Sequence, residues 1–348
     1  MWVSEQGGDE PRRPQRAVTM QDVADHVGVS KALVSMVFRR VQGPSAETRQ
    51  RVRDAAEKLG YRPNRSAALL SLRRSHLIGV MANIRNTFHA EMVEYMVGEA
   101  DSFGYEVVLG AVTPTHGEPA VVETLLDFRC EALILLGPEL DDSEMPTLAA
   151  RAPVVVVGRR TSCPAVDVVR TADARGIGSI VDHLVALGHR RITHLSGGSG
   201  SISADRKAGY LRAMKRHGLS AEIKIIDGDF TEGAGITAAR TLLARTPRPT
   251  AVCAANDRSA IGLLDELRRA GLDIPGDIAV AGYDDSILSQ LTHIDLTTAS
   301  QQPHQQAEEA VKAVVERLDH HRSERRNIVL QPKLIVRRTT ATAEAAVS

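Results

Sequence analysis

Hydrophobic positions divide the sequence into two parts with different periodicities. Between Val18 and Gly60, apolar residues recur every three or four positions over short stretches, which predicts helices. From Leu77 onward, near-continuous runs of Val, Ile, Leu and Ala alternate with helical patterns, which predicts parallel sheets covered by helices on both faces. The expected fold is therefore an all-α head followed by a two-lobed α/β body. The strands are expected at 77–81, 106–112, 132–136, 154–157, 192–195, 223–226, 251–254, 278–281 and 328–330. The clearest helices between them are expected at 174–187, 205–217 and 258–270.

The first part carries start and stop signals for three helices. Thr19 with Asp22 resembles a capping box, and Gly28 breaks the first helix. Ser30 and Ser45 are the expected N-caps of the second and third helices. Two helices joined by a tight glycine turn and supported by a third are typical of a helix-turn-helix. The expected inward positions are Val23, Ala24, Val27, Val34, Val37, Val52, Ala55, Ala56 and Leu59.

Charge distinguishes the two parts as well. The 348 residues contain 43 basic and 43 acidic side chains, so the whole chain is formally neutral. Residues 1–75 hold 14 Lys and Arg against 8 Asp and Glu, a balance of +6, and the remainder holds 29 against 35, a balance of −6. A basic head on an acidic body indicates a polyanionic partner for the head, although a solvated tail would have the same charge.

Several classes of protein are excluded by what the sequence lacks. No stretch approaches the roughly 18–20 uninterrupted apolar residues of a membrane span. Residues 1–16 are polar and lack the apolar core of a secretory signal, so a disordered leader and a cytoplasmic location are expected. Cys130, Cys163 and Cys253 lie far apart, which argues against a disulfide framework or a zinc ribbon.

No catalytic motif is present either. The loop Gly197-Gly198-Ser199-Gly200 follows an expected strand, but it lacks the GxGxxG spacing and no Gly-Lys-Ser/Thr follows it. A flexible connection lining a crevice is the preferred interpretation of this loop. HExxH and GxSxG are absent, and no cysteine has a partner at metal-ligand spacing. We therefore expect no catalytic residue, no metal site and no cofactor.

The head also carries a specific resemblance. The run from Val18 to Phe38 (VTMQDVADHVGVSKALVSMVF) resembles the DNA-binding head of the LacI/GalR family of repressors. The similarity continues over roughly residues 18–340, at Ser-Ala-Glu-Thr-Arg (45–49), Leu-Gly-Tyr-Arg-Pro-Asn (59–64), Leu-Ile-Gly-Val (77–80), Leu-Gly-His (187–189), Asn-Asp (256–257) and Gly-Tyr-Asp-Asp (282–285). It implies a dimeric regulator whose body resembles a periplasmic sugar-binding protein of type I.

The resemblance implies which residues contact DNA. The second helix of a helix-turn-helix lies in the major groove, where its N-terminal side chains read base edges. Lys31 would donate to guanine, and the methyl group of Ala32 would contact thymine. Family members usually carry Arg where Met36 stands, Ser or Thr at the position of Leu33, and Asn at the position of Arg39, so the base preference is expected to be unusual. The implied base-contacting residues are Lys31, Ala32, Ser35 and Met36, and the implied phosphate contacts are Thr19, Ser30, Ser45 and Arg49.

A linker follows the head at residues 63–76. Asn64 is positioned to cap a short helix that contains Ala67 and Leu70. By resemblance this segment is a hinge helix, and Leu70 would wedge between base pairs in the minor groove and bend the duplex. An ordinary interdomain linker is the alternative.

In the body, polar side chains follow two expected strands. Asn256 follows the run 251–254, and Asp284 follows 278–281. Ligands of open α/β sheets bind beyond the carboxyl ends of strands, so both residues are expected in a crevice. For Asp257, the role of N-cap of the next helix is as good an interpretation as a place in the crevice. Asp285 is expected to cap a helix rather than to bind a ligand.

Other crevice residues are indicated by the resemblance or, for Arg206, by the energetic cost of its position. Arg206 is expected in the first turn of a helix, where the helix dipole disfavours a cation, and it matches the family's effector-binding arginine; a salt bridge to Asp205 is the alternative. Phe88 and Phe230 match aromatic crevice positions, although either could belong to a core. Asn83, at the end of the first strand, is a weaker candidate. Gly158 stands where some relatives carry an aspartate.

Together these observations predict a regulator that binds a palindromic operator as a homodimer, controlled by a small carbohydrate or nucleoside between two lobes. The expected divisions are a leader at 1–17, the helix-turn-helix domain at 18–62, the hinge at 63–76, the effector domain at 77–340 and a tail at 341–348. The chain is expected to pass between the lobes near residues 171, 302 and 330. A secreted solute-binding protein and a sugar-modifying α/β enzyme are the alternatives. A secreted protein needs a signal peptide, and this sequence shows none. An enzyme needs a nucleophile, metal or phosphate-binding motif, and none is found.

Overall fold

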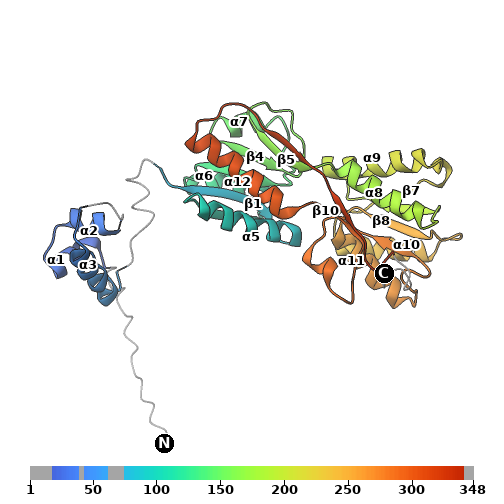
Figure 1. Cartoon of the computed structure of the whole chain (residues 1–348), viewed down its shortest axis with the longest axis horizontal. Helices are drawn as coiled ribbons and strands as arrows, with labels where there is room; N and C mark the ends of the chain where they lie inside the picture. Colours follow the sequence, from blue (N-terminus) through green and yellow to red (C-terminus); the bar gives the residue numbers. More distant parts are fainter. Residues whose placement is uncertain (1–17, 39–42, 62–73, 341–348) are drawn as a thin grey trace, which may run out of the picture. The chain divides into compact units, whose positions relative to one another are not determined.

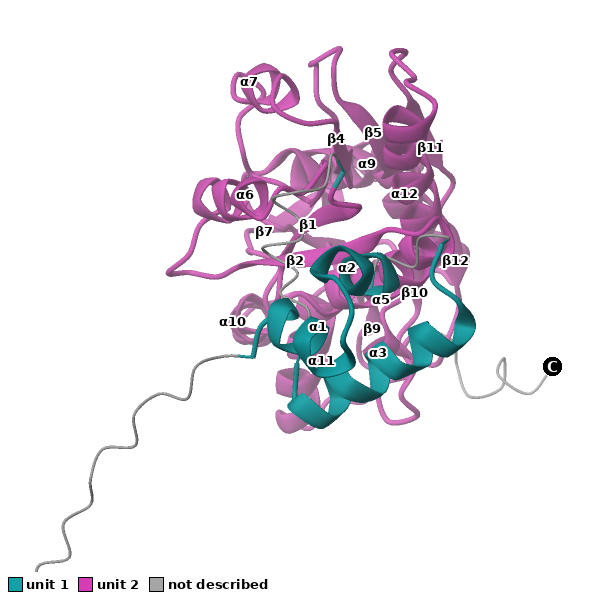
Figure 2. Ribbon diagram, turned by 90° about the vertical axis from the view of Figure 1, so that its left-hand side faces the viewer, with its two compact units in different colours: residues 1–74 teal, residues 75–348 magenta. Residues whose placement is uncertain are grey.

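The computed structural model describes residues 18–38, 43–61 and 74–340. The chain divides into two compact units, Met1–Arg74 and Ser75–Ser348, which are coloured teal and magenta in Figure 2. Each unit has its own hydrophobic core. The predicted combination of an all-helical head with an α/β body is confirmed.

Local capping sets the limits of the helices in the first unit. The Thr19 hydroxyl oxygen accepts from the Asp22 amide at 3.3 Å, and the Asp22 carboxylate accepts from the Thr19 amide at 2.7 Å, which completes the predicted capping box. Gly28 ends the first helix with φ +75°, a left-handed conformation that suits glycine. Ser45 caps the third helix by accepting from Thr48 at 3.2 Å. The helices are α1 (Met20–Val27), α2 (Lys31–Phe38) and α3 (Ala46–Leu59).

The three helices enclose a small core at the positions that the apolar pattern predicts. Val27 and Leu59 are only partly buried at its edge. The rings of Phe38 and Tyr61 lie 5.5 Å apart, centroid to centroid, so the end of α2 is held near the end of α3. The buried residues are Val23, Ala24, Val34, Val37, Val52, Ala55, Ala56 and Tyr61.

The second unit begins with lobe 1, which is built on a six-stranded parallel sheet of order β11-β5-β4-β3-β1-β2 (Figure 1). Ile78 and Val80 on β1 face the core beneath α5 and α12, whereas Met81 faces the core beneath α6 and α7. Both faces are therefore buried. The strands are β1 (Leu77–Asn83), β2 (Glu106–Val112), β3 (Ala132–Leu136), β4 (Val154–Val157), β5 (Asp167–Thr171) and β11 (Asn327–Leu330). The helices are α5 (Thr87–Ser102), α6 (Glu118–Asp127), α7 (Met145–Ala149) and α12 (Pro303–Asp319).

Lobe 2 repeats this plan with a four-stranded parallel sheet of order β7-β6-β8-β9. Cys253 on β8 packs toward α8 and α9, and its neighbour Val252 packs toward α10 and α11. The strands are β6 (Ile192–Leu195), β7 (Lys224–Ile226), β8 (Ala251–Ala254) and β9 (Ala279–Ala281). The helices are α8 (Asp173–Ala186), α9 (Ser201–Arg216), η1 (Ser220–Glu222), α10 (Glu232–Leu243), α11 (Asp257–Arg269) and η2 (Ile287–Gln290).

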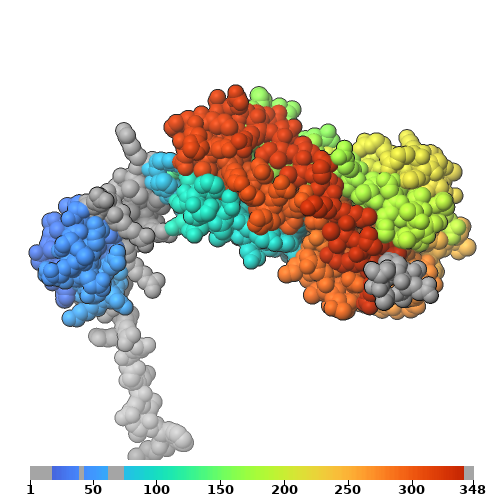
Figure 3. Space-filling model, in the orientation of Figure 1, coloured from blue at the N-terminus to red at the C-terminus, as the bar shows by residue number. Residues whose placement is uncertain are grey.

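The chain runs between the two lobes at three places. β5 of lobe 1 leads directly into α8 of lobe 2, and the strand β10 (Thr298–Ser300) returns to α12 of lobe 1. β11 then leads to β12 (Lys333–Ile335), which pairs antiparallel with β10. In Figure 3 this last stretch, in red, runs across the surface of both lobes. We call these three connections the interlobe hinge.

The strands absent from the sequence prediction share a polar composition. β5 begins at Asp167 and contains Arg170, while β10 and β12 have three residues each. Asp167 is fully buried because Arg317 and Arg322 both donate to its carboxylate, at 2.7 and 2.6 Å. A buried charge that is paired in this way interrupts the apolar run that identifies a buried strand.

In the described residues, no helix is both long and apolar enough to cross a membrane.

Helices α10 and α11 meet through their backbones at two glycines. A Cβ atom on Gly235 would lie 2.1 Å from the carbonyl oxygen of Ser259, and one on Gly262 would lie 2.1 Å from that of Glu232. Neither contact can be relieved by rotating a side chain. Glycine is therefore required at these two positions.

We expect Gly235→Ala to lower the free energy of unfolding by about 1–3 kcal/mol, because the added methyl group pushes two backbones apart. Gly233→Ala is the control on the same helix, since its Cβ would come no closer than 3.7 Å to Thr231. The control should change stability by no more than about 1 kcal/mol, in the stabilising direction. Urea unfolding followed by circular dichroism measures both, and equal stability of the two variants would contradict the packing argument.

Candidate functional site

Helix α2 presents a short polar face outside the core of the first unit. Ser30 accepts from the Leu33 amide at 3.2 Å, so the helix begins at Lys31 as predicted. Lys31 and Ala32 are exposed, and Ser35 and Met36 are half-buried. The predicted base-contacting residues therefore lie together on the solvent side of α2. A Cβ on Gly43 would lie 2.8 Å from the terminal methyl of Met36, so this side chain folds back onto the chain after α2.

The residues predicted to contact phosphates lie at helix starts, where their polar atoms already have partners. The hydroxyl groups of Thr19 and Ser45 act in the caps described above. The Nε atom of Arg49 donates to the carbonyl oxygen of Pro44 at 3.1 Å. Contact with phosphate stays a prediction for all of these residues. Asn64, Ala67 and Leu70 lie outside the described residues.

Arg206 forms the centre of the polar cluster in the second unit. Its side chain is 4% exposed. The Nε atom donates to Asp173 at 2.9 Å, and one terminal nitrogen donates to the carbonyl oxygen of Ala255 at 2.6 Å and lies 3.5 Å from Asp284. Burial raises the pKa of Asp173, and the positive charge of Arg206 opposes this shift. The guanidinium group is thus held between two carboxylates.

Two of the sequence-based statements about Arg206 are wrong. Helix α9 begins at Ser201 and not at 205, so Arg206 lies in the second turn, where the helix dipole has little influence. Asp205 is not its partner, because the Asp205 carboxylate forms an ion pair with Arg160 of lobe 1. The reason for burying this arginine is its pairing with Asp173 and Asp284.

Aromatic rings surround the same guanidinium group. Its central carbon lies 4.0 Å from the ring centroid of Tyr283 and 5.6 Å from that of Phe230. Phe230 has φ +66°, and a Cβ on Gly197 would lie 2.1 Å from the tip of its ring. The glycine-rich loop therefore makes room for the phenyl ring of Phe230.

Asn256 connects the end of β8 to the segment that contains Phe230. Its side-chain oxygen accepts from the Ser259 amide at 3.0 Å, and its nitrogen donates to the carbonyl oxygen of Phe230 at 3.0 Å. Asn256 is therefore the N-cap of α11, and the predicted cap at Asp257 is wrong. The buried carboxylate of Asp257 instead accepts from the Ser286 amide at 2.8 Å.

Asp284 closes the cluster on the side of the hinge. Its carboxylate accepts from the Gln301 side chain at 2.7 Å, and its backbone has φ +123°. Burial raises the pKa of Asp257, and the negative charge of Asp284 adds to this shift. Burial also raises the pKa of Asp284, and the positive charge of Arg206 opposes it. Asp285 does not cap a helix as predicted, because its carboxylate accepts from Arg337 at 2.6 Å.

Three members of this cluster, Asp173, Tyr283 and Gln301, were not among the sequence candidates. Asp173 and Gln301 lie beside the expected crossovers near 171 and 302, and Tyr283 is part of the Gly-Tyr-Asp-Asp motif. The position of a polar residue at a crossover was the signal that could have identified Asp173 and Gln301.

The lobe 1 candidates, Asn83 and Phe88, do not take part in the described hydrogen bonds and ring contacts of Arg206. Asn83 is exposed at the end of β1, where its side-chain oxygen accepts from the Arg85 amide at 3.0 Å. Phe88 is 7% exposed and packs in the core of lobe 1. The lobes approach each other where a Cβ on Gly158 would lie 3.6 Å from the Ile202 side chain of α9.

Comparisons with known proteins agree with both parts of the chain. Residues 19–64 match the family described as bacterial regulatory proteins, lacI family, and residues 181–340 match a periplasmic binding protein-like domain. The lactose operon repressor of Escherichia coli strain K12 is 33% identical over 334 residues, which cover 93% of this chain and 91% of that protein.

Solved structures extend this agreement to the fold. The LacI transcriptional regulator from a Rhodococcus species has 44% sequence identity and a TM-score of 0.74 over 76% of this chain and 98% of that one. The lac repressor dimer bound to operator and the anti-inducer ONPF has 29% identity and a TM-score of 0.80 over 94% of this chain and 100% of that one. On the strength of its exposed α2 face, its two lobes and these relatives, the chain belongs to the LacI/GalR family and is a DNA-binding transcriptional regulator.

Proposed function

We propose that this regulator is a repressor whose affinity for a palindromic operator is set by a sugar or nucleoside bound between lobes 1 and 2. The observation that carries the proposal is the buried arginine Arg206, held between Asp173 and Asp284 beneath the Phe230 ring. Fixed charged donors and acceptors beside an aromatic face suit a polyhydroxylated ligand. The effector-binding residues that we propose are Asn83, Phe88, Arg206, Phe230, Asn256 and Asp284.

The mechanism uses the three connections between lobe 1 and lobe 2. An effector that contacts both lobes stabilises one relative orientation, and the equilibrium shifts only by its difference in affinity for the two orientations. In a dimer, reorientation of the lobes changes the spacing of the two heads and so their fit to the operator. The body acts as a sensor, and we propose no catalytic role for it.

On the DNA side, we propose that residues 18–62 form the DNA-binding domain. Residues 63–76 form the hinge helix and linker, which lead to the effector domain at 77–340. Lys31, Ala32, Ser35 and Met36 would read bases, and Leu70 would wedge into the minor groove. Asn64 and Ala67 would support that hinge. The phosphate contacts in this proposal are Thr19, Ser30, Ser45 and Arg49. A role on chromosomal DNA places the protein in the cytoplasm.

A homodimer is supported by apolar side chains that a single chain leaves in water. Ile287 is 63% exposed and Ile84 is 54% exposed, and Val97 and Leu291 are also exposed. A contiguous apolar surface marks a site that meets another protein, and we propose that these four side chains contribute to such a surface.

We expect selection from random duplexes at about 100 mM salt to enrich a palindrome, and Lys31→Ala to weaken binding to it by roughly 5- to 100-fold, since a lost base contact costs about 1–3 kcal/mol. Lys58→Ala is the control. It removes the same charge from the exposed last turn of α3, outside the proposed reading helix, and should have a small effect. Equal losses for the two variants would show that Lys31 acts only through its charge.

The effector site is tested by Asp284→Asn. A panel of sugars and nucleosides is screened by thermal shift, and the best ligand is then measured by calorimetry. The variant should bind that ligand roughly 10- to 100-fold more weakly, because a charge-assisted hydrogen bond is lost. Asp285→Asn changes the adjacent residue, which is paired with Arg337, and should retain the affinity. Unchanged affinity in Asp284→Asn would remove Asp284 from the site.

The dimer is tested by replacing both Ile287 and Leu291 with Glu. Two charges in an apolar interface should convert the protein to a monomer with an unchanged circular dichroism spectrum. Phe128→Glu alters a side chain that is 57% exposed at the end of α6 and should leave the dimer intact. Sedimentation velocity distinguishes the species, and a dimer that persists in the double variant would place the interface elsewhere.

A further inference from the structure

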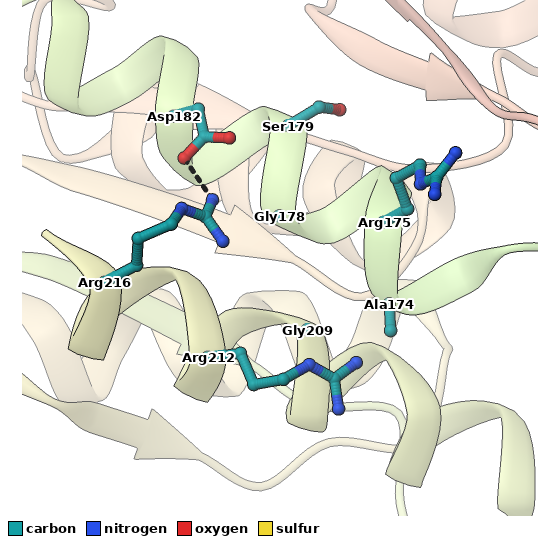
Figure 4. A pocket seen from close by; sticks show the side chains of 8 residues that line it. All are labelled: Ala174, Arg175, Gly178, Ser179, Asp182, Gly209, Arg212 and Arg216. Carbon is teal, nitrogen blue, oxygen red and sulfur yellow. Dashed lines mark hydrogen bonds and ion pairs between the residues drawn. The ribbon is translucent and has the colours of Figure 1, made fainter.

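A hollow lies between α8 and α9 on the outer side of lobe 2. It has a volume of about 440 Å³, and an adjoining hollow of about 330 Å³ continues it toward lobe 1. Figure 4 shows the first of these, with Arg212 and Arg216 extending from α9 and Arg175 and Asp182 from α8. The two hollows share Ala174, Arg175 and Arg212.

Glycines create this space. A Cβ on Gly209 would lie 2.4 Å from the carbonyl oxygen of Ala174, so the backbones of α8 and α9 touch at this point. One turn further along α8, Gly178 has no atom within 4 Å of the place where its Cβ would be. The helices are thus close enough to share one surface, while the missing side chain leaves it concave.

The lining of the two hollows has an excess of positive charge. Each carboxylate that borders them is already paired with a cation. These pairs are Asp173 with Arg206, Asp182 with Arg216, and Asp205 with Arg160. Arg170, Arg175 and Arg212 remain, and none of the three forms an ion pair with a described residue. Three positive charges therefore converge on the hollow without a neutralising group.

The hydrogen bonds of these arginines are also incomplete. One terminal nitrogen of Arg170 donates to the carbonyl oxygen of Thr171 at 3.3 Å, while its Nε atom is buried and has no hydrogen-bond partner. Arg175 donates to the Gln331 side chain at 2.6 Å. A buried donor without an acceptor costs about 1–3 kcal/mol, so an acceptor placed there would be bound favourably. The start of α8, where Ala172 provides no side-chain cap, adds a positive helix end to the same wall.

We propose that this hollow binds a small anion of the phosphate class, with Arg170, Arg175 and Arg212 as its ligands. A planar guanidinium group offers paired donors that match phosphate oxygens. The combined space exceeds what a phosphate group alone requires, so a phosphorylated small molecule fits as well as the free ion. Arg170, Arg175 and Arg212 line the hollow, and none of them is among the proposed effector-binding residues.

The position of the hollow gives the anion a regulatory effect, and this part of the inference rests on the proposed function. Arg170 and Val329 belong to lobe 1, whereas Arg175 and Arg212 belong to lobe 2. An anion held by both sets fixes the relative orientation of the lobes from outside the crevice. Asp173 borders the hollow and also holds Arg206, so the two sites share one carboxylate.

Binding is tested on the full-length dimer without DNA or effector. Isothermal titration calorimetry is performed with inorganic phosphate, with glucose 6-phosphate and with glucose, at constant ionic strength. We expect phosphate or glucose 6-phosphate to bind, and Arg212→Gln to weaken that binding at least tenfold. Lys215→Gln removes a charge from an exposed position of the same helix outside the hollow and should bind normally.

The outcomes separate the possible ligands and the two proposals. Tighter binding of glucose 6-phosphate than of phosphate, with loss in Arg212→Gln, identifies a phosphorylated metabolite, and equal binding identifies the inorganic ion. Loss of anion binding in Asp284→Asn, with normal anion binding in Arg212→Gln, would place the ligand in the crevice and overturn the inference. Failure of both anions to bind the unaltered protein would also overturn it. Operator affinity with and without the bound anion then tests the regulatory part. If an anion binds through Arg212 but does not change operator affinity, the anion site is confirmed and its regulatory effect is rejected.

Discussion

The buried guanidinium group of Arg206 is the constraint on which the second unit depends. Removing a charged group from water costs several kcal/mol unless it is paired and fully hydrogen-bonded. Its partners come from separate parts of the chain: Asp173 follows the first crossover, Ala255 follows β8, and Asp284 follows β9. The folded lobe 2 can bury Arg206 only when these three segments meet. One side chain therefore ties the hinge to the carboxyl ends of the strands.

A chain of hydrogen bonds extends this constraint to the other crossovers. Gln301 donates to Asp284 at 2.7 Å, and its carbonyl oxygen accepts from the Gln306 side chain at 2.8 Å. Gln306 also donates to Thr171 at 3.1 Å, which connects the second crossover to the first. The Gln302 side chain donates to the carbonyl oxygen of Gln331 in the third. Because these hydrogen bonds join all three connections, the connections form one network.

The parts of this fold that follow from the sequence are those set by local chemistry. The caps at Thr19, Ser30 and Ser45 were predictable because each depends on a side chain within three residues of its partner. Strands such as β3 and β8 were predictable because they are uniformly apolar and buried. The solvent-facing side of α2, which we propose reads DNA, followed from the buried positions of Val34 and Val37.

The parts that did not follow depend on contacts between distant segments. β5 is buried with its charge because Asp167 meets Arg317 and Arg322, which lie about 150 residues later in the chain. The pairing of Arg206 with Asp173 in place of Asp205 has the same origin, since only the fold brings α8 beside α9. Whether Asn256 or Asp257 caps α11 depended on one residue of register, and the hydrogen bond from Ser286 to Asp257 decides it. Local pattern can rank such candidates but cannot choose between them.

The contacts between the lobes determine how strongly a ligand must bind in order to control the protein. Arg160 of lobe 1 pairs with Asp205 of lobe 2, but the Arg160 side chain is 62% exposed, so the pair contributes at most about 1 kcal/mol. The approach of Ile202 to Gly158 adds one small apolar contact. These two links contribute little to the relative orientation of the lobes. By this reasoning, a ligand with a modest preference for one orientation would be enough to shift the population between orientations.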